Sequence, residues 1–250
     1  SSAAAGADGD GRDANASDPG DYCGGQASSW HGTHVAGIIA AGWTGSFAVG
    51  VAPNAKILPV RVLGACGGSL SDVADGLVWA AGGAVAGVPV NPTPARVLNL
   101  SLGGRGECYS YMQAAIDKAR SLGAVVVVSA GNSNESASNM VPANCAGVIT
   151  VAAVDRAAGR AVWSSTAASN FGSAVDVAAP GTSIRSLSNS GSTVPGRDAA
   201  RLMSGTSMAA PHVAGVAALM LARNPSLTPD QIKTWIKTSA RPYTDGRTDL

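Results

Sequence analysis

The hydrophobic pattern of the chain consists of short, continuous apolar runs that alternate with segments of helical periodicity. The apolar runs are rich in valine, isoleucine and leucine, which is typical of strands buried on both faces of a parallel sheet. We predict strands over Lys56–Leu63, Arg96–Leu102, Gly123–Ala130 and Gly147–Val154. Because helical segments separate these runs, the pattern indicates an α/β fold, a doubly wound and mostly parallel sheet with helices on both faces.

Helical segments are predicted between and after these strands. They are Ser71–Ala86, Tyr109–Leu122, Thr206–Arg223 and a helix that follows Thr228. The last has a strong start signal, because Thr228 is a good N-cap, Pro229 suits the first helical position and Gln231 completes a capping box. A further helical segment begins at His31, and the stretch Gly82–Pro94, rich in Gly and Pro, predicts a surface loop.

Composition favours one globular domain over residues 1–250. This length is enough to bury a full-sized core, and no internal repeat or linker divides it. Residues 1–28 form a polar head, rich in Asp and Gly, without a helix or strand pattern. A net charge of +1 and a charged fraction of 13% exclude the basic surface of a nucleic-acid-binding protein, and no apolar run is long enough to span a bilayer. We therefore expect a monomer without nucleic-acid or membrane partners.

The four cysteines lie far apart in the chain and form no C-x-x-C pair; they are Cys23, Cys66, Cys108 and Cys145. This spacing does not suit zinc, whereas an even number of distant cysteines is typical of disulfides in a secreted protein. Three pairings are open. We expect Cys23–Cys66 and Cys108–Cys145, since this choice ties each half of the chain locally, and four buried free thiols are the alternative.

The three histidines lie in two motifs rich in small residues, HGTHVAG at 31–37 and GTSMAAPHVAG at 205–215. In the second motif, Gly205 allows a tight turn before Ser207, which opens the predicted helix, where free backbone N–H groups gather. A hydroxyl at that place can attack a carbonyl while backbone N–H groups hold the resulting oxyanion. An ordinary N-cap serine is the alternative interpretation.

Asn132 and His31 can complete such chemistry. Asn132 ends the motif SAGN at the carboxyl end of a predicted strand, where α/β sheets build their sites, although Ala-Gly-Asn is also a common turn. His31 begins its helical segment and, as an imidazole that titrates near neutral pH, suits a general base. His34 lies on nearly the same helix face, but no H-E-x-x-H arrangement indicates a metal pair. We interpret His34 and His212 as structural.

Together these motifs resemble those of the subtilisin-like serine proteases, the subtilase family. The order of the His, Asn and Ser motifs is the family's order, and the Ser motif matches continuously over residues 205–215. The resemblance runs from about residue 29 to residue 223 and includes GVAP at 50–53 and DVAAPG at 176–181. It implies that Ser207 is the nucleophile, that His31 is the general base and acid, and that Asn132 donates to the oxyanion together with the Ser207 N–H.

The resemblance also implies where a substrate binds. An extended peptide would add as a strand to one segment, and the backbone of a second segment would form the other wall of the first specificity pocket. The first segment is Ser101, Leu102 and Gly103, the second is Ser129, Ala130 and Gly131, and Met140 lies near the pocket floor. Because these residues carry no charge, we expect a broad, apolar preference.

One part of the family's pattern is missing. Subtilases carry a catalytic Asp in a D-T/S-G turn after an apolar strand upstream of the His motif, and no such turn occurs in this sequence. We expect that the first strand and its Asp precede Ser1 and that both ends of the chain are cut. Because the carboxylate fixes the histidine tautomer and the strand belongs to the sheet, we expect residues 1–250 alone to be poorly stable and nearly inactive.

The carboxylates of the head have a separate interpretation. Asp8, Asp10 and Asp13 cluster in a Gly-rich segment, and oxygen ligands of this kind suit a hard cation such as Ca²⁺. The segment departs from an EF-hand loop, because Asp13 occupies the glycine position and Pro19 the position of the final glutamate. A solvated loop is the alternative. Subtilases often carry structural calcium, and the resemblance implies that the chemistry itself requires no cofactor.

These observations predict a secreted, extracellular serine endopeptidase that hydrolyses protein or peptide substrates through an acyl-enzyme. The alternative is a non-catalytic subtilase-like domain that binds peptide in the same groove. The missing Asp favours the alternative, whereas the presence of Ser207, His31 and Asn132 together argues against it.

Overall fold

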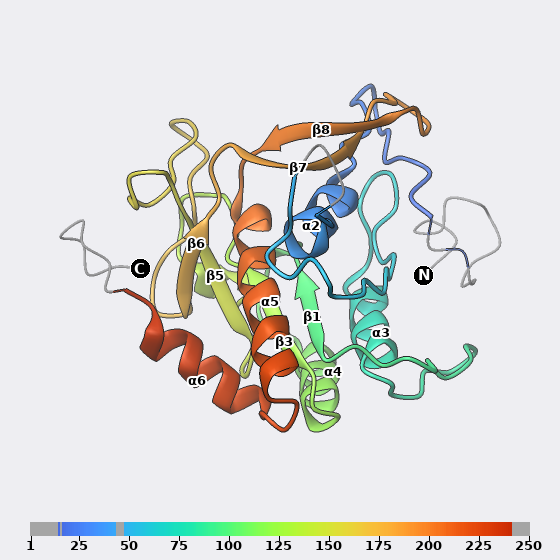
Figure 1. The fold of residues 1–250 in the computed structure, drawn as a ribbon, viewed down its shortest axis with the longest axis vertical. Helices are drawn as coiled ribbons and strands as arrows, with labels where there is room; N and C mark the ends of the chain where they lie inside the picture. Colours follow the sequence, from blue (N-terminus) through green and yellow to red (C-terminus); the bar gives the residue numbers. More distant parts are fainter. Residues whose placement is uncertain (1–14, 16, 44–47, 242–250) are drawn as a thin grey trace.

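A parallel sheet of four strands lies at the centre of the molecule (Figure 1). The structure is a computed structural model, and it describes residues 15, 17–43 and 48–241. The strands are β1 (Val97–Leu100), β3 (Val125–Ser129), β5 (Ile149–Val154) and β6 (Val177–Pro180), hydrogen-bonded in the order β1-β3-β5-β6. All three pairings are parallel. The predicted strands 96–102, 123–130 and 147–154 are thereby confirmed, with shorter ends.

Helices cover both faces of the sheet, which confirms the doubly wound α/β architecture. On one face pack α3 (Leu70–Ala80) and α4 (Ser110–Ser121); on the other pack α5 (Thr206–Arg223) and α6 (Pro229–Ser239). Successive residues of β3 face opposite cores, as a strand requires: Val126 and Val128 pack with α3 and α4, whereas Val125 and Val127 pack with α5 and α6. The capping box at Thr228 forms as predicted.

The predicted strand Lys56–Leu63 is wrong. The segment is irregular, and Ile57 and Leu63 are exposed, while Val60 and Val62 pack against the core beside α3. No neighbouring strand in the described part of the chain pairs with it. Since a strand is stable only when its backbone groups find partners, apolar residues alone do not make this segment part of the sheet.

The helix predicted over 71–86 ends earlier, at Ala80. Gly82 follows with a φ of 90°, and its amide bonds to the carbonyl of Trp79, which stops the helix in a turn. The expected loop 82–94 then runs to β1 without a helix or strand.

Two small antiparallel pairs were not predicted. Short strands β2 (Gly104–Arg105) and β4 (Met140–Val141) pair beside the carboxyl ends of β1 and β3, and the 3₁₀ turn η1 (Ala137–Asn139) precedes β4. The hairpin of β7 (Ile184–Asn189) and β8 (Asp198–Met203) lies across the top of the view in Figure 1, above α2 (His31–Ala40). This hairpin packs against α2, which begins with a candidate catalytic residue.

Both expected disulfides are present, Cys23–Cys66 and Cys108–Cys145, so the alternative of four free thiols is not observed. Across residues 15, 17–43 and 48–241, no helix is both long and apolar enough to cross a membrane. The candidate calcium ligands Asp8, Asp10 and Asp13 lie outside the described residues.

Candidate active site

Ser207 lies in the first turn of α5, at the amino end of the helix. The N-cap Gly205 has a φ of 153°, and its amide donates to the carbonyl of Gly181 at 2.8 Å. This turn leaves the Ser207 side chain partly exposed, with its hydroxyl donating to the carbonyl oxygen of Ser101 at 3.3 Å. The first N–H groups of a helix have no partner within it, so the backbone amide of Ser207 is available to an anion.

The side chain of Asn132 is held in one orientation beside this helix end. Its Oδ1 accepts hydrogen bonds from the backbone N–H and from the hydroxyl of Thr206, both at 2.9 Å. The hydroxyl of Thr206 in turn accepts from the amide of Gly131 at 3.1 Å. No hydrogen bond within the described residues engages Nδ2 of the exposed Asn132, so this group can donate. A Cβ built on Gly205 would lie 3.4 Å from Nδ2 and 3.7 Å from the Ser207 amide nitrogen, so both nitrogens lie beside the same turn.

His31 is the first residue of α2, which packs against α5. Burial lowers the pKa of its imidazole below the usual 6.5, the nearby His34 lowers this pKa further, and the charge of Asp21 acts in the opposite direction. A lowered pKa leaves the ring neutral at pH 7 and able to accept a proton. No hydrogen bond among the described residues joins His31 to Ser207; the serine hydroxyl donates to Ser101 instead.

Asp21 lies near His31 but does not bond to its ring. Its two carboxylate oxygens accept from the backbone N–H and the hydroxyl of Ser29, and that hydroxyl accepts from the His31 backbone amide at 3.3 Å. The carboxylate therefore organises the entry to α2, and its effect on the imidazole is through space.

The other two histidines make contacts that support a structural role. His34 is fully buried, and because both partners of its Nε2 are carbonyl oxygens, of Ile184 at 3.1 Å and Arg201 at 3.0 Å, this nitrogen carries the proton. It thereby ties α2 to both strands of the hairpin. His212 donates from Nδ1 to the carbonyl of Met208 at 2.8 Å, one turn earlier in α5.

The candidate substrate-binding residues converge on the same place. Ser101, Leu102 and Gly103 directly follow β1, and the hydroxyl of Ser101 donates to the Ser207 carbonyl at 2.7 Å. Ser129 ends β3, and Ala130 and Gly131 continue from it. Gly131 has a φ of 100°, a left-handed conformation that favours glycine. Both segments thus reach the carboxyl edge of the sheet, beside the amino end of α5.

Met140 lies beneath the second of these segments. The residue is 8% exposed, and its Cε would lie 3.3 Å from a Cβ built on Gly131. The methionine therefore lies against Gly131, one of the candidate substrate-binding residues.

Sequence reasoning missed two residues that shape the site. Thr206 orients Asn132, and its place in the Gly-Thr-Ser motif was a signal that could have indicated this role. Asn170 is fully buried; it donates to the carbonyl of Ala130 at 3.0 Å and accepts from the amide of Ser133 at 2.9 Å. Nothing in the local sequence around Asn170 marks it, because its partners are distant in the chain.

In the ranges 17–43 and 48–241, together with residue 15, no group of three or more His, Cys, Asp or Glu side chains could hold a metal ion. No part of the chemistry below depends on a metal ion.

Comparison with known proteins gives consistent matches. Residues 4–250 match the model of the Subtilase family. An "Extracellular protease" of Xanthomonas campestris is 52% identical over 245 residues, and an "Extracellular basic protease" of Dichelobacter nodosus is 46% identical over 253 residues. In both cases the match covers 94% of this chain and 41% of the relative, so the chain spans less than half the length of these relatives.

Two solved structures show how far the fold is shared. A protease of Pseudoalteromonas arctica has a TM-score of 0.92 at 50% identity, over 96% of this chain and 75% of that one. A cold-adapted subtilisin-like serine proteinase has a TM-score of 0.67 at 39% identity, over 84% of this chain and 67% of that one.

Proposed function

Because the chain belongs to the subtilase family, we propose that the full-length protein is a secreted serine endopeptidase acting through an acyl-enzyme. The observation that carries the proposal is the arrangement of Ser207, Asn132 and Thr206. Ser207 has a hydroxyl at a helix amino end, and Thr206 next to it engages the oxygen of the Asn132 amide, which supports the roles of nucleophile for Ser207 and oxyanion donor for Asn132.

In the proposed reaction, Ser207 Oγ attacks the carbonyl carbon of the scissile peptide bond while His31 accepts the hydroxyl proton. The carbonyl oxygen becomes an oxyanion, which accepts from Asn132 Nδ2 and the Ser207 N–H. His31 then gives its proton to the leaving amine, and the C–N bond breaks to leave an ester on Ser207. Water, deprotonated by His31, attacks the ester, and the serine leaves with the returned proton.

This reaction requires the serine hydroxyl to exchange its bond to the Ser101 carbonyl for one to His31. A bond of 3.3 Å to a neutral carbonyl is weak, so the exchange costs little. Burial keeps His31 neutral, which supports its role as the base.

The substrate would lie as an added strand along Ser101–Gly103. The P1 side chain, which belongs to the residue before the scissile bond, would lie between that segment and Ser129–Gly131. Met140 would form part of the pocket floor. Because the described walls and floor carry no charged side chain, we expect apolar P1 residues to be preferred.

Two disulfides, together with relatives named extracellular proteases, support secretion to an oxidising compartment. We expect a monomer whose partners are its protein or peptide substrates. The proposed reaction uses only groups of the protein itself, which include a hydroxyl, an imidazole, a side-chain amide and a backbone N–H, so it needs no cofactor. Asp8, Asp10 and Asp13 remain candidate ligands for a structural calcium ion.

Labelling with a small alkyl fluorophosphonate tests the proposal, because this reagent reacts with an activated serine. We expect the full-length protein to be labelled and Ser207→Ala to abolish both labelling and peptide hydrolysis. Ser226→Ala is a matched control, since this exposed serine follows α5 and lies at the end of the helix opposite Ser207. No labelling of a folded full-length protein would refute the proposal and favour the non-catalytic peptide-binding alternative.

A further inference from the structure

We propose that Asn144 and the Cys108–Cys145 disulfide are positioning groups that fix the floor of the P1 pocket and so determine which P1 side chains are accepted. The inference rests on the proposed peptidase function and concerns groups outside the reacting set. It follows from how the turn 140–146 contacts the pocket walls and from what holds that turn in place.

The turn touches both candidate walls. A Cβ built on Gly103 would lie 2.9 Å from the carbonyl oxygen of Val141, and one built on Gly131 would lie 3.3 Å from Met140 Cε. The pairing of β2 with β4 adds a direct backbone link, in which Gly104 lies opposite Val141. A shift of residues 140–141 would therefore change the distance between the walls and the depth of the space between them.

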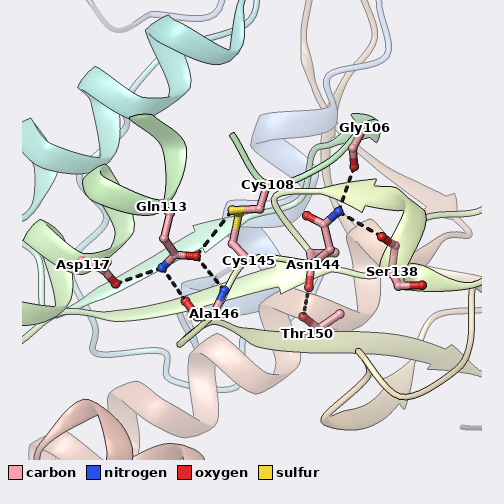
Figure 2. The surroundings of a disulfide bond; sticks show 10 residues. Gly106, Cys108, Gln113, Asp117, Ser138, Asn144, Cys145, Ala146 and Thr150 are labelled. Carbon is pink, nitrogen blue, oxygen red and sulfur yellow. Dashed lines mark hydrogen bonds between the residues drawn. A yellow bond between two sulfur atoms is a disulfide. The ribbon is translucent and has the colours of Figure 1, made fainter. Parts of the chain in front are cut away.

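Asn144 fastens the end of this turn to the elements on either side (Figure 2). Its Nδ2 donates to the carbonyl of Gly106, just after β2, at 2.8 Å and to the carbonyl of Ser138, within η1, at 3.0 Å. Its backbone amide donates to the carbonyl of Met140 at 2.8 Å. The side chain of Asn144 thus connects the segment after β2 to the turn before β4, and its backbone amide bonds to the floor residue Met140.

The adjacent disulfide attaches the same turn covalently to the segment that follows β2. Cys145 is bonded to Cys108, which follows β2, and its amide donates to the carbonyl of Pro142 at 3.0 Å. Gln113 of α4 completes the attachment: it accepts from the amide of Ala146 at 2.8 Å and donates to the carbonyl of Ala146 at 3.1 Å (Figure 2). The turn is therefore fixed covalently and to a helix of the main fold.

The hydrogen bonds of Asn144 indicate that its side chain acts by holding neighbouring segments in position. Its Oδ1 is buried and has no hydrogen-bond partner within the described structure, which is an unfavourable state for an amide oxygen. The Nδ2 group of the same side chain donates to two backbone carbonyl oxygens, those of Gly106 and Ser138. An aspartate has nearly the same shape and no donor, so it provides a sharp test of this role.

The turn does not contact the reacting groups by hydrogen bonds. Asn132 is held by Thr206, and Ser207 by Ser101, both outside residues 140–146. Loosening the turn should therefore alter P1 selection while Ser207 keeps its reactivity toward a small reagent that does not fill the pocket.

The experiment uses the full-length protein with peptides that differ only at P1, carrying Ala, Leu or Phe. In Asn144→Ala and Asn144→Asp, with the disulfide intact, we expect the ratio of kcat/KM between Phe and Ala to change by about tenfold or more. The double variant Cys108→Ser/Cys145→Ser, which lacks the disulfide, should change the Phe/Ala ratio of kcat/KM in the same direction as the Asn144 variants. Labelling by a small alkyl fluorophosphonate should stay within a factor of about three of the unmodified protein.

Lys237→Met is the control for a general loss of stability. Lys237 lies on α6, and its Nζ pairs with the Asp176 carboxylate at 2.8 Å. Removing this ion pair should lower Tm without changing the P1 ratio. The inference would be overturned if the Asn144 and cysteine variants label normally but keep the Phe/Ala ratio of kcat/KM unchanged. It would also be overturned if Lys237→Met changes this ratio as much as they do. Failure of the unmodified protein to label would instead refute the proposed function on which the inference rests.

Discussion

At the scale of single residues, the site depends on how each polar group is oriented. Thr206 uses its backbone and side chain to hold one end of the Asn132 amide, which leaves the other end as a donor with a fixed direction. A donor held before the reaction needs no reorganisation when negative charge develops, which is why such groups stabilise a transition state strongly.

The first prediction concerns Asn132→Leu. In subtilisin, removal of one side-chain oxyanion donor lowers kcat by about 10²–10³, and we expect a loss of this order in the full-length protein. KM should change little, because the donor acts on charge that appears only in the transition state. Steady-state kinetics on one peptide substrate provide the test, and an unchanged kcat would remove Asn132 from the proposed reaction.

A second prediction separates orientation from donation. Thr206→Val keeps the shape of the side chain but removes the hydroxyl that bonds to Asn132 and Gly131. We expect kcat to fall by less than in Asn132→Leu, and the double variant to be no worse than Asn132→Leu alone, since both act through the same group. Additive losses in the double variant would contradict this account.

At the scale of elements, α2 must lie close to the hairpin to place His31. Gly37 allows α2 to lie this close to β7. A Cβ on Gly37 would clash with Ser186 Oγ and would lie 2.8 Å from Leu187 Cγ, and both residues belong to β7. The missing side chain lets the helix pack directly on the strand, and His34 bonds to the same hairpin three residues earlier.

We therefore expect Gly37→Ala to destabilise the full-length protein by about 1–3 kcal/mol, through overpacking between α2 and β7. Peptidase activity should fall with it, because displacement of α2 moves His31. Gly32→Ala in the same helix is the matched control for stability, since a Cβ there meets nothing within 4 Å. Thermal unfolding measures both variants, and equal Tm changes would show that the close approach does not matter.

Particular elements show what the sequence could and could not predict. The strands at 97–100, 125–129 and 149–154 are continuous apolar runs buried on both faces, and the helices α5 and α6 have clear start signals, so local patterns were sufficient. The segment 56–63 has the same apolar character but no strand partner in the described chain. An apolar segment can form a buried strand only where a partner strand exists, and the local pattern does not show whether one does.

The site divides in the same way. Ser207, His31 and Asn132 lie in motifs whose residue types suit the proposed chemistry, so they could be named as candidates from the sequence. Asn170 and Asn144 act through bonds to backbone groups that are distant in the chain or set by turn geometry. An isolated asparagine in a loop gives no signal of such contacts, and only the three-dimensional structure identifies them.

At the scale of the whole molecule, burial lowers the pKa of all three histidines, His31, His34 and His212. A folded-state pKa below the unfolded value of 6.5 means that the unfolded chain takes up protons first as the pH falls. Stability is therefore unaffected by these groups above pH 6.5 and decreases as the pH falls below it.

We expect Tm of the full-length protein to fall between about pH 7 and about pH 5, above the range in which most carboxylates titrate. His34→Asn should reduce this dependence, since it removes a fully buried imidazole while keeping one donor for the hairpin carbonyls. Calorimetry at a series of pH values gives the answer. A Tm that is flat or rises toward pH 5, or a dependence that is the same in His34→Asn, would contradict the prediction.

The most direct test of the account is to trap the acyl-enzyme. The full-length protein is mixed with a nitrophenyl ester that acylates rapidly and deacylates slowly, quenched in acid and digested for mass spectrometry. The account predicts one acyl group per molecule, on the peptide that contains Ser207, and none in Ser207→Ala. An acyl group on a different residue, or hydrolysis of peptide substrates that persists in Ser207→Ala, would contradict it.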